Sequence, residues 1–263
     1  MKKGHQPRKR FGQNFLRDPG IINRIVDAIA PTADQHLVEI GPGEGAITEL
    51  LLESGCQFDA IELDRDLVPM LLARFDRKPN FSIHQADALR FDFSALYSGE
   101  RPLRLVGNLP YNISTPLIFH LLEQADIIED MHFMLQLEVV NRLAAQPGSK
   151  AWGKLGVMAQ YHCEVSALFE VPPGAFTPAP KVQSAIVRLQ PRNRPDSSPE
   201  QEARLRKVVT AAFAQRRKTL RNNLRHLLDM DRLEQLDISP TARAETLELE
   251  QFLALAELLA EQD

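Results

Sequence analysis

The sequence predicts an α/β protein built on a parallel β-sheet covered on both faces, followed by a small all-helical domain. Strand and helix patterns alternate along the first two thirds of the chain, which is typical of β-α-β units. The strand segments are short and largely apolar, as expected where both faces of a sheet are covered. After a proline-rich stretch at 191–199, only helical patterns remain.

The predicted elements follow in a regular order. Strands are predicted at 37–40, 58–63, 81–84, 103–106, 131–137 and 184–189, the last after an extended proline-rich loop at 171–181. Helices are predicted at 21–30, 46–54, 66–75, 115–122, 138–145 and 155–163, and then at 200–215, 218–227, 231–236 and 247–260. We place the domain boundary in the linker, which gives a domain over 1–191 with a basic N-terminal arm at 1–17, and a helical domain over 192–263.

Composition indicates an ordinary globular protein. Of the 263 residues, 44% are hydrophobic and 25% are charged, enough for one full α/β domain and a small appendage. No apolar run is long enough to span a membrane, and the basic N-terminus lacks the apolar stretch of a signal peptide. Cys56 and Cys163 match no metal or redox spacing, so we predict two reduced thiols, no bound metal and a cytoplasmic location.

The charge is segregated along the chain, although the net charge is only −4. Residues 226–263 contain ten Asp and Glu against two Arg, which gives −8 there and leaves +4 for residues 1–225. Two stretches, 1–17 and 203–225, contain many cations and no acid, which favours a polyanionic partner over a merely solvated face. The candidate contacts to that partner are Arg8, Lys9, Arg10, Arg216, Arg217, Lys218 and Arg221.

A glycine-rich turn, Gly-Pro-Gly-Glu-Gly at 41–45, joins the first strand of the sheet to the helix after it. Glycines such as Gly41 and Gly43 permit positive φ and a close approach of the backbone to a ligand. The helix N-terminus adds free N–H groups. This turn fits dinucleotide enzymes and methyltransferases equally well.

Two carboxylates sharpen the prediction of a nucleoside-containing cofactor. Glu62 ends the next strand, 21 residues after Gly41, where it can accept hydrogen bonds from both hydroxyls of a ribose. Asp64 is the alternative for this role. Asp87 follows the third strand and can accept a hydrogen bond from an adenine amine, although alone it is typical of a turn. The carboxyl ends of parallel strands share one crevice, so these groups should meet there.

The residues after the fourth strand indicate the chemistry. They read Asn108-Leu109-Pro110-Tyr111. The lone pair of the adenine N6 is delocalised into the ring, so an acceptor for each N–H is needed to free it. The Asn108 side-chain oxygen can be one acceptor, and the Leu109 carbonyl can be the other, because Pro110 biases Leu109 to an extended conformation. Tyr111 can stack on the base.

A base within folded RNA must be extruded to reach such a pocket, and a second aromatic ring is expected to sandwich it. Phe176, in the loop stiffened by Pro178 and Pro180, is the candidate. We expect the prolines to hold this ring in place without burying it.

The chain resembles the ribosomal small-subunit RNA adenine-N6,N6-dimethyltransferases, the family named for kasugamycin resistance. The matching segments are 11–16, 41–45, Glu62, Asp87 with Ala88, 108–111, 176–181 and 213–218. The resemblance implies a Rossmann-like, seven-stranded class I methyltransferase sheet that forms the catalytic domain, with a helical domain that binds RNA or the ribosome. It also implies that S-adenosylmethionine supplies two methyl groups to each of two adjacent adenosines near the 3′ end of 16S rRNA, in the small subunit or its precursor.

The resemblance further implies which residues contact the cofactor and the RNA. Those of the cofactor site are Gln13, Asn14, Leu16, Gly41, Gly43, Glu62, Asp87, Ala88 and Asn108. Lys181 joins the cations expected to contact RNA, and we expect the protein to act as a monomer. Leu109 stands where related DNA adenine methyltransferases favour proline, and the carbonyl role survives this difference.

Three alternatives remain open at the level of sequence. A large-subunit rRNA dimethyltransferase of the macrolide-resistance type shares the sheet and the Asn-Leu-Pro-Tyr chemistry, but the run at 213–223 favours the small subunit. A DNA adenine methyltransferase would normally carry a larger target-recognition region. A non-catalytic ribosome-assembly factor would have no need for intact Asn108, Tyr111 and Glu62.

Overall fold

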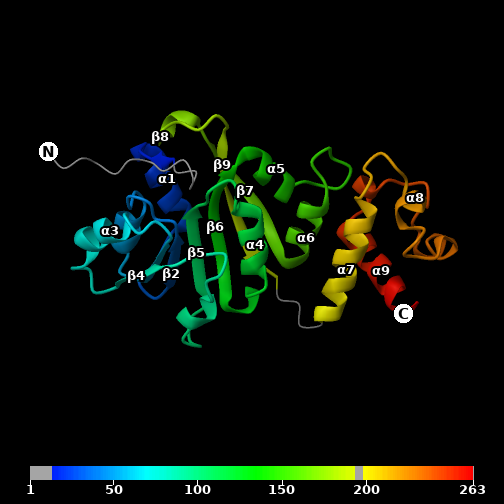
Figure 1. The fold of residues 1–263 in the computed structure, drawn as a ribbon, viewed down its shortest axis with the longest axis horizontal. Coiled ribbons are helices and arrows are strands. Elements are labelled where there is room, and N and C mark those ends of the chain that lie inside the picture. Colours follow the sequence, from blue (N-terminus) through cyan, green and yellow to red (C-terminus); the bar gives the residue numbers. More distant parts are fainter. Residues whose placement is uncertain (1–13, 193–197, 263) are drawn as a thin grey trace. The chain divides into compact units, whose positions relative to one another are not determined.

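The computed structural model describes residues 14–192 and 198–262, which form two compact units (Figure 1). The first unit holds the described residues up to Val140 together with Ser166–Pro191. The second holds Asn141–Val165 and the described residues from Arg192 onward. The second unit thus includes a segment that the sequence boundary at 191 assigns to the first domain, because α6 (Lys154–His162) packs against the C-terminal helices.

A seven-stranded sheet, with strand order β4-β3-β2-β5-β6-β9-β7, confirms the sheet that the family resemblance implies. Its strands are β2 (His36–Ile40), β3 (Gln57–Glu62), β4 (Phe81–Gln85), β5 (Leu103–Asn108), β6 (Ile128–Gln136), β7 (Cys163–Val171) and β9 (Ser184–Pro191). In the sheet, the five neighbouring strands β4, β3, β2, β5 and β6 pair in parallel. Strand β9 pairs antiparallel with β6. The expectation of a parallel sheet therefore holds for five strands and not for the β6–β9 pair.

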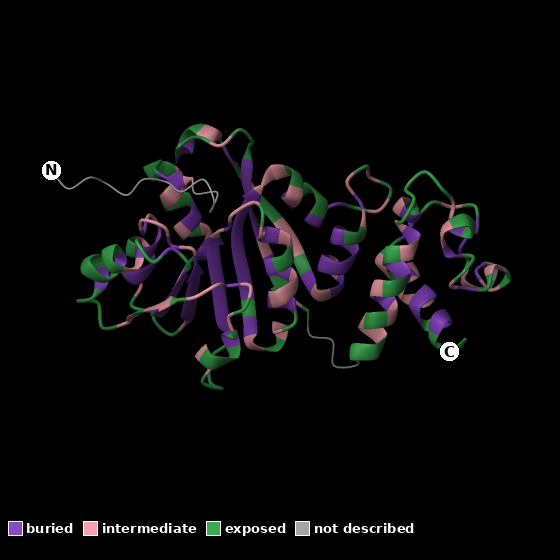
Figure 2. Cartoon of the chain, in the orientation of Figure 1, coloured by how far each residue is buried: buried purple, intermediate pink, exposed green. Residues whose placement is uncertain are grey.

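The central strands are buried on both faces. In β2 every residue is buried, and in β5 every residue except Asn108 is buried (Figure 2). Successive side chains of a strand point to opposite faces, so burial at consecutive positions means that both faces are covered. The helices of the first unit are α1 (Pro19–Ile29), α2 (Thr48–Leu52), α3 (Val68–Phe75), α4 (Ser114–Leu122) and the start of α5 (Leu137–Leu143).

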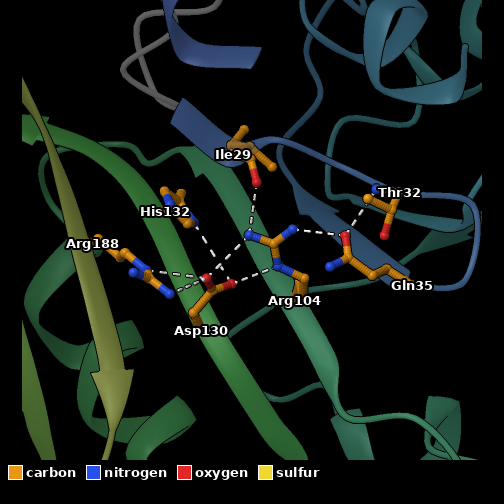
Figure 3. Close-up of polar contacts among 7 residues, drawn as sticks. All are labelled: Ile29, Thr32, Gln35, Arg104, Asp130, His132 and Arg188. Atoms are coloured by element: carbon orange, nitrogen blue, oxygen red, sulfur yellow. Dashed lines mark hydrogen bonds and ion pairs between the residues drawn. The ribbon is translucent and has the colours of Figure 1, made fainter. Parts of the chain in front are cut away.

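A buried ion-pair cluster fastens α1 to the amino-terminal side of the sheet (Figure 3). Arg104 on β5 donates from Nε and Nη2 to the Asp130 carboxylate on β6, at 2.9 and 3.1 Å. The same guanidinium donates to the Ile29 carbonyl oxygen at 2.8 Å and to Gln35 Oε1 at 2.8 Å. Burial alone would raise the pKa of Asp130, but the hydrogen bonds from Arg104 and the charges of His132, Arg104 and Arg188 bring it below its ordinary value.

Several elements differ from the sequence predictions. The helix expected to end at Cys163 ends at His162, and the nine-residue strand β7 follows it directly. Strand β7 has mixed polarity and lies at a sheet edge, so no buried apolar run marks it. Strands β1 (Phe15–Leu16) and β8 (Phe176–Thr177) form a separate antiparallel pair. The helix expected at 231–236 is two short 3₁₀ turns, Met230–Arg232 and Glu234–Leu236.

The second unit is helical around its own core. It contains α6, α7 (Pro199–Ala212), α8 (Leu220–Leu224) and α9 (Leu249–Ala260). The Phe213 and Phe252 rings stack at 5.7 Å between centroids, and Trp152 Nε1 donates to the Leu247 carbonyl oxygen at 2.9 Å. None of the helices in the described part of the chain has the length and apolarity that a membrane crossing requires.

Candidate active site

A cavity of about 370 Å³ opens at the carboxyl-terminal edge of the sheet in the first unit. It brings together the ends of β2, β3 and β5, the turn after β4, and the segment at β1. Its lining residues are Asn14, Phe15, Leu16, Ile40, Gly41, Gly43, Ile61, Glu62, Leu63, Leu67, Ala86, Asp87, Ala88, Asn108, Leu109, Pro110, Tyr111, Asn112 and Ile113. Every described residue that the sequence assigned to the cofactor lines this cavity. Gln13 lies outside the described residues.

The glycine-rich turn is tied to the end of β3. Gly41 N–H donates to the Ile61 carbonyl oxygen at 2.9 Å, and Gly43 N–H donates to Glu62 Oε2 at 3.3 Å. Gly43 has a φ of 60°, and a Cβ at this position would lie 3.2 Å from the Phe15 ring. A side chain there would be strained by its backbone and crowded by Phe15, so glycine keeps this wall of the cavity open.

Glu62, and not Asp64, faces the cavity. The Glu62 side chain is 6% exposed, and its Oε1 accepts from Asp64 N–H at 2.7 Å. Burial raises the pKa of this carboxyl, and the hydrogen bonds from Asp64 N–H and Gly43 N–H offset part of that effect. Each carboxylate oxygen has a second lone pair, so both can still accept from hydroxyl groups. Asp64 instead accepts from Asp66 N–H at 3.1 Å.

Asp87 combines a turn with a place in the cavity wall. Its Oδ1 accepts from Leu89 N–H at 3.0 Å, which is the turn geometry expected of an aspartate at such a position. Ala86 N–H donates to the Glu62 carbonyl oxygen at 3.1 Å and holds this turn against the end of β3. Ala88 is buried beside it. The turn thereby fixes where the carboxylate of Asp87 lies.

Glu39 is a buried carboxyl to which the sequence interpretation gave no role. It is 2% exposed within β2, and Thr48 Oγ1 at the start of α2 donates to its Oε2 at 2.5 Å. Burial raises the pKa of Glu39 to about 8. The bond spans the glycine-rich turn from the strand before it to the helix after it. The signal in the sequence was a carboxylate placed between Val38 and Ile40 in an apolar strand.

Asn108 ends β5 in a crowded part of the structure. A Cβ on the preceding Gly107 would lie 2.5 Å from the Ile40 carbonyl oxygen, so only glycine lets β5 approach β2 here. Asn108 Nδ2 donates to the Asn14 carbonyl oxygen at 3.2 Å. This bond orients the amide and leaves Oδ1 as its acceptor. Leu109 is buried, and its N–H donates to the Met134 carbonyl oxygen at 3.2 Å.

Tyr111 is held at both ends. Its hydroxyl lies 2.8 Å from Ser184 Oγ, at the start of β9, and Ser114 Oγ donates to its backbone carbonyl oxygen at 3.3 Å. Both serines are buried, with 1% exposure for Ser184 and 2% for Ser114. The ring itself is half-buried and lines the cavity. The described structure therefore gives this aromatic ring a fixed position in the cavity wall.

The expectation that the proline-rich loop leaves Phe176 unburied is wrong. Phe176 is 4% exposed, belongs to the hydrophobic core and does not line the cavity. It sits in β8, where it pairs with Leu16 of β1, and Arg17 N–H donates to the Ala175 carbonyl oxygen at 2.8 Å. This strand pairing places the ring in the core. Strands of only two residues leave no recognisable pattern in a sequence, so the pairing could not be predicted.

The candidate RNA-contacting cations differ in their surroundings. In the first unit Lys181 is exposed in the loop before β9. In the second unit Arg216, Arg217, Lys218 and Arg221 are all exposed. Of these, Arg216 also donates to the Lys150 carbonyl oxygen and lies 3.5 Å from Glu245. The remaining three candidates lie outside the described residues; they are Arg8, Lys9 and Arg10.

Comparison with known proteins gives matches along almost the whole chain. Residues 4–261 match the family described as "Ribosomal RNA adenine dimethylase". Proteins named "Ribosomal RNA small subunit methyltransferase A" are 60% identical in Hahella chejuensis, over 97% of this chain and 93% of that protein, and 58% identical in Pseudomonas aeruginosa, over 98% and 96%.

Two solved structures share the fold across both units. The 23S rRNA methyltransferase ErmE is 30% identical with a TM-score of 0.75, and the match covers 94% of this chain and 100% of that one. A dimethyladenosine transferase from Plasmodium falciparum is 25% identical with a TM-score of 0.78, covering 92% and 95%. The chain belongs to the ribosomal RNA adenine dimethylase family.

Proposed function

We propose that this chain is an S-adenosylmethionine-dependent enzyme that dimethylates the N6 amine of two adjacent adenosines near the 3′ end of 16S rRNA. It acts on the small subunit or its precursor, in the cytoplasm and as a monomer. One observation carries this proposal: the cavity brings Glu62 and Asp87 together with Asn108 and Tyr111. The relatives named as small-subunit methyltransferases support the choice of RNA.

The residues of the cavity fit S-adenosylmethionine. Glu62 has free lone pairs for the two ribose hydroxyls, and Asp87 can accept from the amine of the cofactor's adenine. The backbone of the glycine-rich turn leaves room for the cofactor to approach it closely, and Asn14 and Leu16 also line the cavity. When bound, the cofactor supplies an already activated sulfonium methyl group.

The chain's own residues orient and activate the amine. Asn108 Oδ1 accepts one N–H of the substrate, since its Nδ2 is engaged by Asn14. The Leu109 carbonyl accepts the other, which draws the nitrogen toward tetrahedral geometry and frees its lone pair. Tyr111 stacks on the extruded base. Positioning and alignment then carry most of the rate, and no strong general base is required.

A second stacking role for Phe176 stays a prediction. The ring lies in the core, so stacking on a base requires the short β8 segment to turn it into the cavity. The exposed cations Lys181, Arg217 and Arg221 would contact phosphates of the RNA.

Two other functions fit less well. The large-subunit enzyme ErmE is 30% identical to this chain, half the identity of the Hahella protein named for the small subunit. A purely non-catalytic assembly factor would not need an amide oriented by Asn14 at the end of β5. Catalysis and an assembly role can coexist in one protein.

The experiment is methyl transfer from labelled S-adenosylmethionine to unmethylated small subunits, comparing the wild type with Asn108→Ala. The variant should lose about 2–4 kcal/mol of transition-state stabilisation, roughly 30- to 1000-fold in kcat, because one acceptor for the amine is gone. Glu53→Gln, which changes an exposed residue outside the cavity, is the control. Near-normal turnover of Asn108→Ala would discard the proposed acceptor.

A further inference from the structure

Ser184 is a buried hydroxyl residue outside the cavity that touches the residue proposed to stack on the substrate base. We propose that Ser184 is a positioning residue for methyl transfer, which fixes the ring of Tyr111 as the platform for the extruded adenine. This inference rests on the proposed function, and it adds a residue that makes no contact with either substrate.

Strand pairing and a backbone hydrogen bond hold Ser184 in place. Ser184 is the first residue of β9 and pairs with Gln136 of β6, and Leu137 N–H donates to the Gln183 carbonyl oxygen at 2.9 Å. Tyr111 belongs to the loop after β5. In the sheet, β6 lies between β5 and β9. The 2.8 Å bond between the two hydroxyls therefore spans the carboxyl-terminal end of β6 and joins the loop to β9.

This bond limits the motion that matters for stacking. A tyrosine ring swings about the bond nearest the backbone, and Ser114 Oγ already holds the Tyr111 carbonyl oxygen. Among the described residues, Ser184 is the hydrogen-bond partner that holds the far end of the ring. With both ends fixed, the face of the ring is set before the base arrives, so less ordering remains for the bound complex.

The hydrogen bond between Ser184 and Tyr111 predicts which kinetic and binding constants should change when it is removed. RNA binding depends mainly on many phosphate contacts, so removal of the bond should slow turnover more than it weakens binding of the particle. Ser184 does not line the cavity, so cofactor affinity should not change. Ser184→Ala and Tyr111→Phe remove the same bond from opposite sides, so their effects should not add.

The test measures kcat and KM with unmethylated small subunits for both single variants, the double variant and Ser54→Ala. Ser54 Oγ donates to the Leu51 carbonyl oxygen at 2.7 Å in the same unit and lies outside the cavity, so it controls for loss of a hydroxyl. Each site variant should lose about 5- to 100-fold in kcat with KM within about twofold. The double variant should be no slower than the singles, and Ser54→Ala should match the wild type.

A second measurement tests the hydrogen bond between Ser184 and Tyr111 without relying on enzyme activity. The chain has three tyrosines, so carbon-13 at the hydroxyl-bearing ring carbon gives three NMR signals, and Tyr111→Phe identifies one by its disappearance. Ser184→Ala should shift that signal and leave the other two in place. Normal kcat in Ser184→Ala, multiplied losses in the double variant, or an unshifted signal would overturn the inference.

The controls separate this result from other failures. If the wild type transfers no methyl group, the proposed function fails, while the NMR signal still reports the bond. If Ser184→Ala does not fold, Tyr111→Phe removes the same hydrogen bond and keeps the ring, so its kcat decides. A loss of cofactor affinity by calorimetry in Tyr111→Phe would mean a wider disturbance of the cavity and would also overturn the inference.

Discussion

The stability of the first unit should depend on pH through Glu39, and the substitution Glu39→Gln tests this. Glu39 lies inside β2 with 2% exposure, and Thr48 donates to it. Burial raises its pKa from 4.5 to about 8. Glutamine has nearly the same shape and can accept the same hydrogen bond, but it carries no proton to lose.

The direction of the effect follows from proton linkage. Below pH 4.5 both the folded and the unfolded chain keep the proton on Glu39, so its contribution to stability is complete. As the pH rises, the unfolded chain releases the proton while the folded chain retains it until about pH 8. Each pH unit in this window costs about 1.4 kcal/mol, so the loss by neutral pH is on the order of 3 kcal/mol.

The assay is urea unfolding followed by circular dichroism between about pH 5 and about pH 8. The free energy of unfolding of Glu39→Gln, relative to the wild type, should rise steadily across this range as the wild type loses stability. Glu53→Gln, which alters an exposed carboxyl at the end of α2, should follow the wild type. If the free energy of unfolding of Glu39→Gln changes with pH in the same way as that of the wild type, Glu39 does not have the raised pKa given above.

Three further perturbations follow from the structure. Glu62→Ala should weaken S-adenosylmethionine binding by about 2 kcal/mol, roughly 30-fold, because ribose hydrogen bonds to a carboxylate are lost; unchanged affinity by calorimetry would reassign the residue. Arg104→Met should lower the free energy of unfolding by about 3–5 kcal/mol, since it leaves a buried carboxylate poorly paired; a decrease below about 1 kcal/mol would refute this. Replacing Arg217 and Arg221 by Gln should weaken binding to the small subunit and reduce its salt dependence by about one unit of slope for each phosphate that is no longer neutralised, so an unchanged slope would show that these cations face elsewhere.

The parts of the fold that could be predicted are those in which local pattern and tertiary environment agree. The central residues of β2, β3 and β5 are buried on both faces, so apolar residues predominate in these strands and polar residues are the exceptions among them. The glycine-rich turn was recognisable because close backbone approach and positive φ leave glycine as the residue of choice. Carboxylates at strand ends could be placed in one crevice by topology alone.

The parts that could not be predicted depend on contacts between distant segments. Strand β7 lies at an edge and alternates irregularly between buried and exposed residues, so it has no periodic signature. Phe176 is drawn into the core by pairing with Leu16, about 160 residues earlier in the chain. Ser184 and Glu39 act through single hydrogen bonds to Tyr111 and Thr48, and a lone serine or a lone carboxylate in a strand does not reveal its partner.

The proposed function requires that the pocket at the carboxyl-terminal end of β5 delivers methyl groups to adenine N6 in 16S rRNA. This transfer can be measured directly. Unmethylated small and large ribosomal subunits are offered together with labelled S-adenosylmethionine, and the labelled nucleotides are mapped by mass spectrometry. We expect N6,N6-dimethyladenosine at two adjacent positions near the 3′ end of 16S rRNA, with 23S rRNA unlabelled. Label in 23S rRNA, on another atom, or on no nucleotide at all would contradict the proposed function.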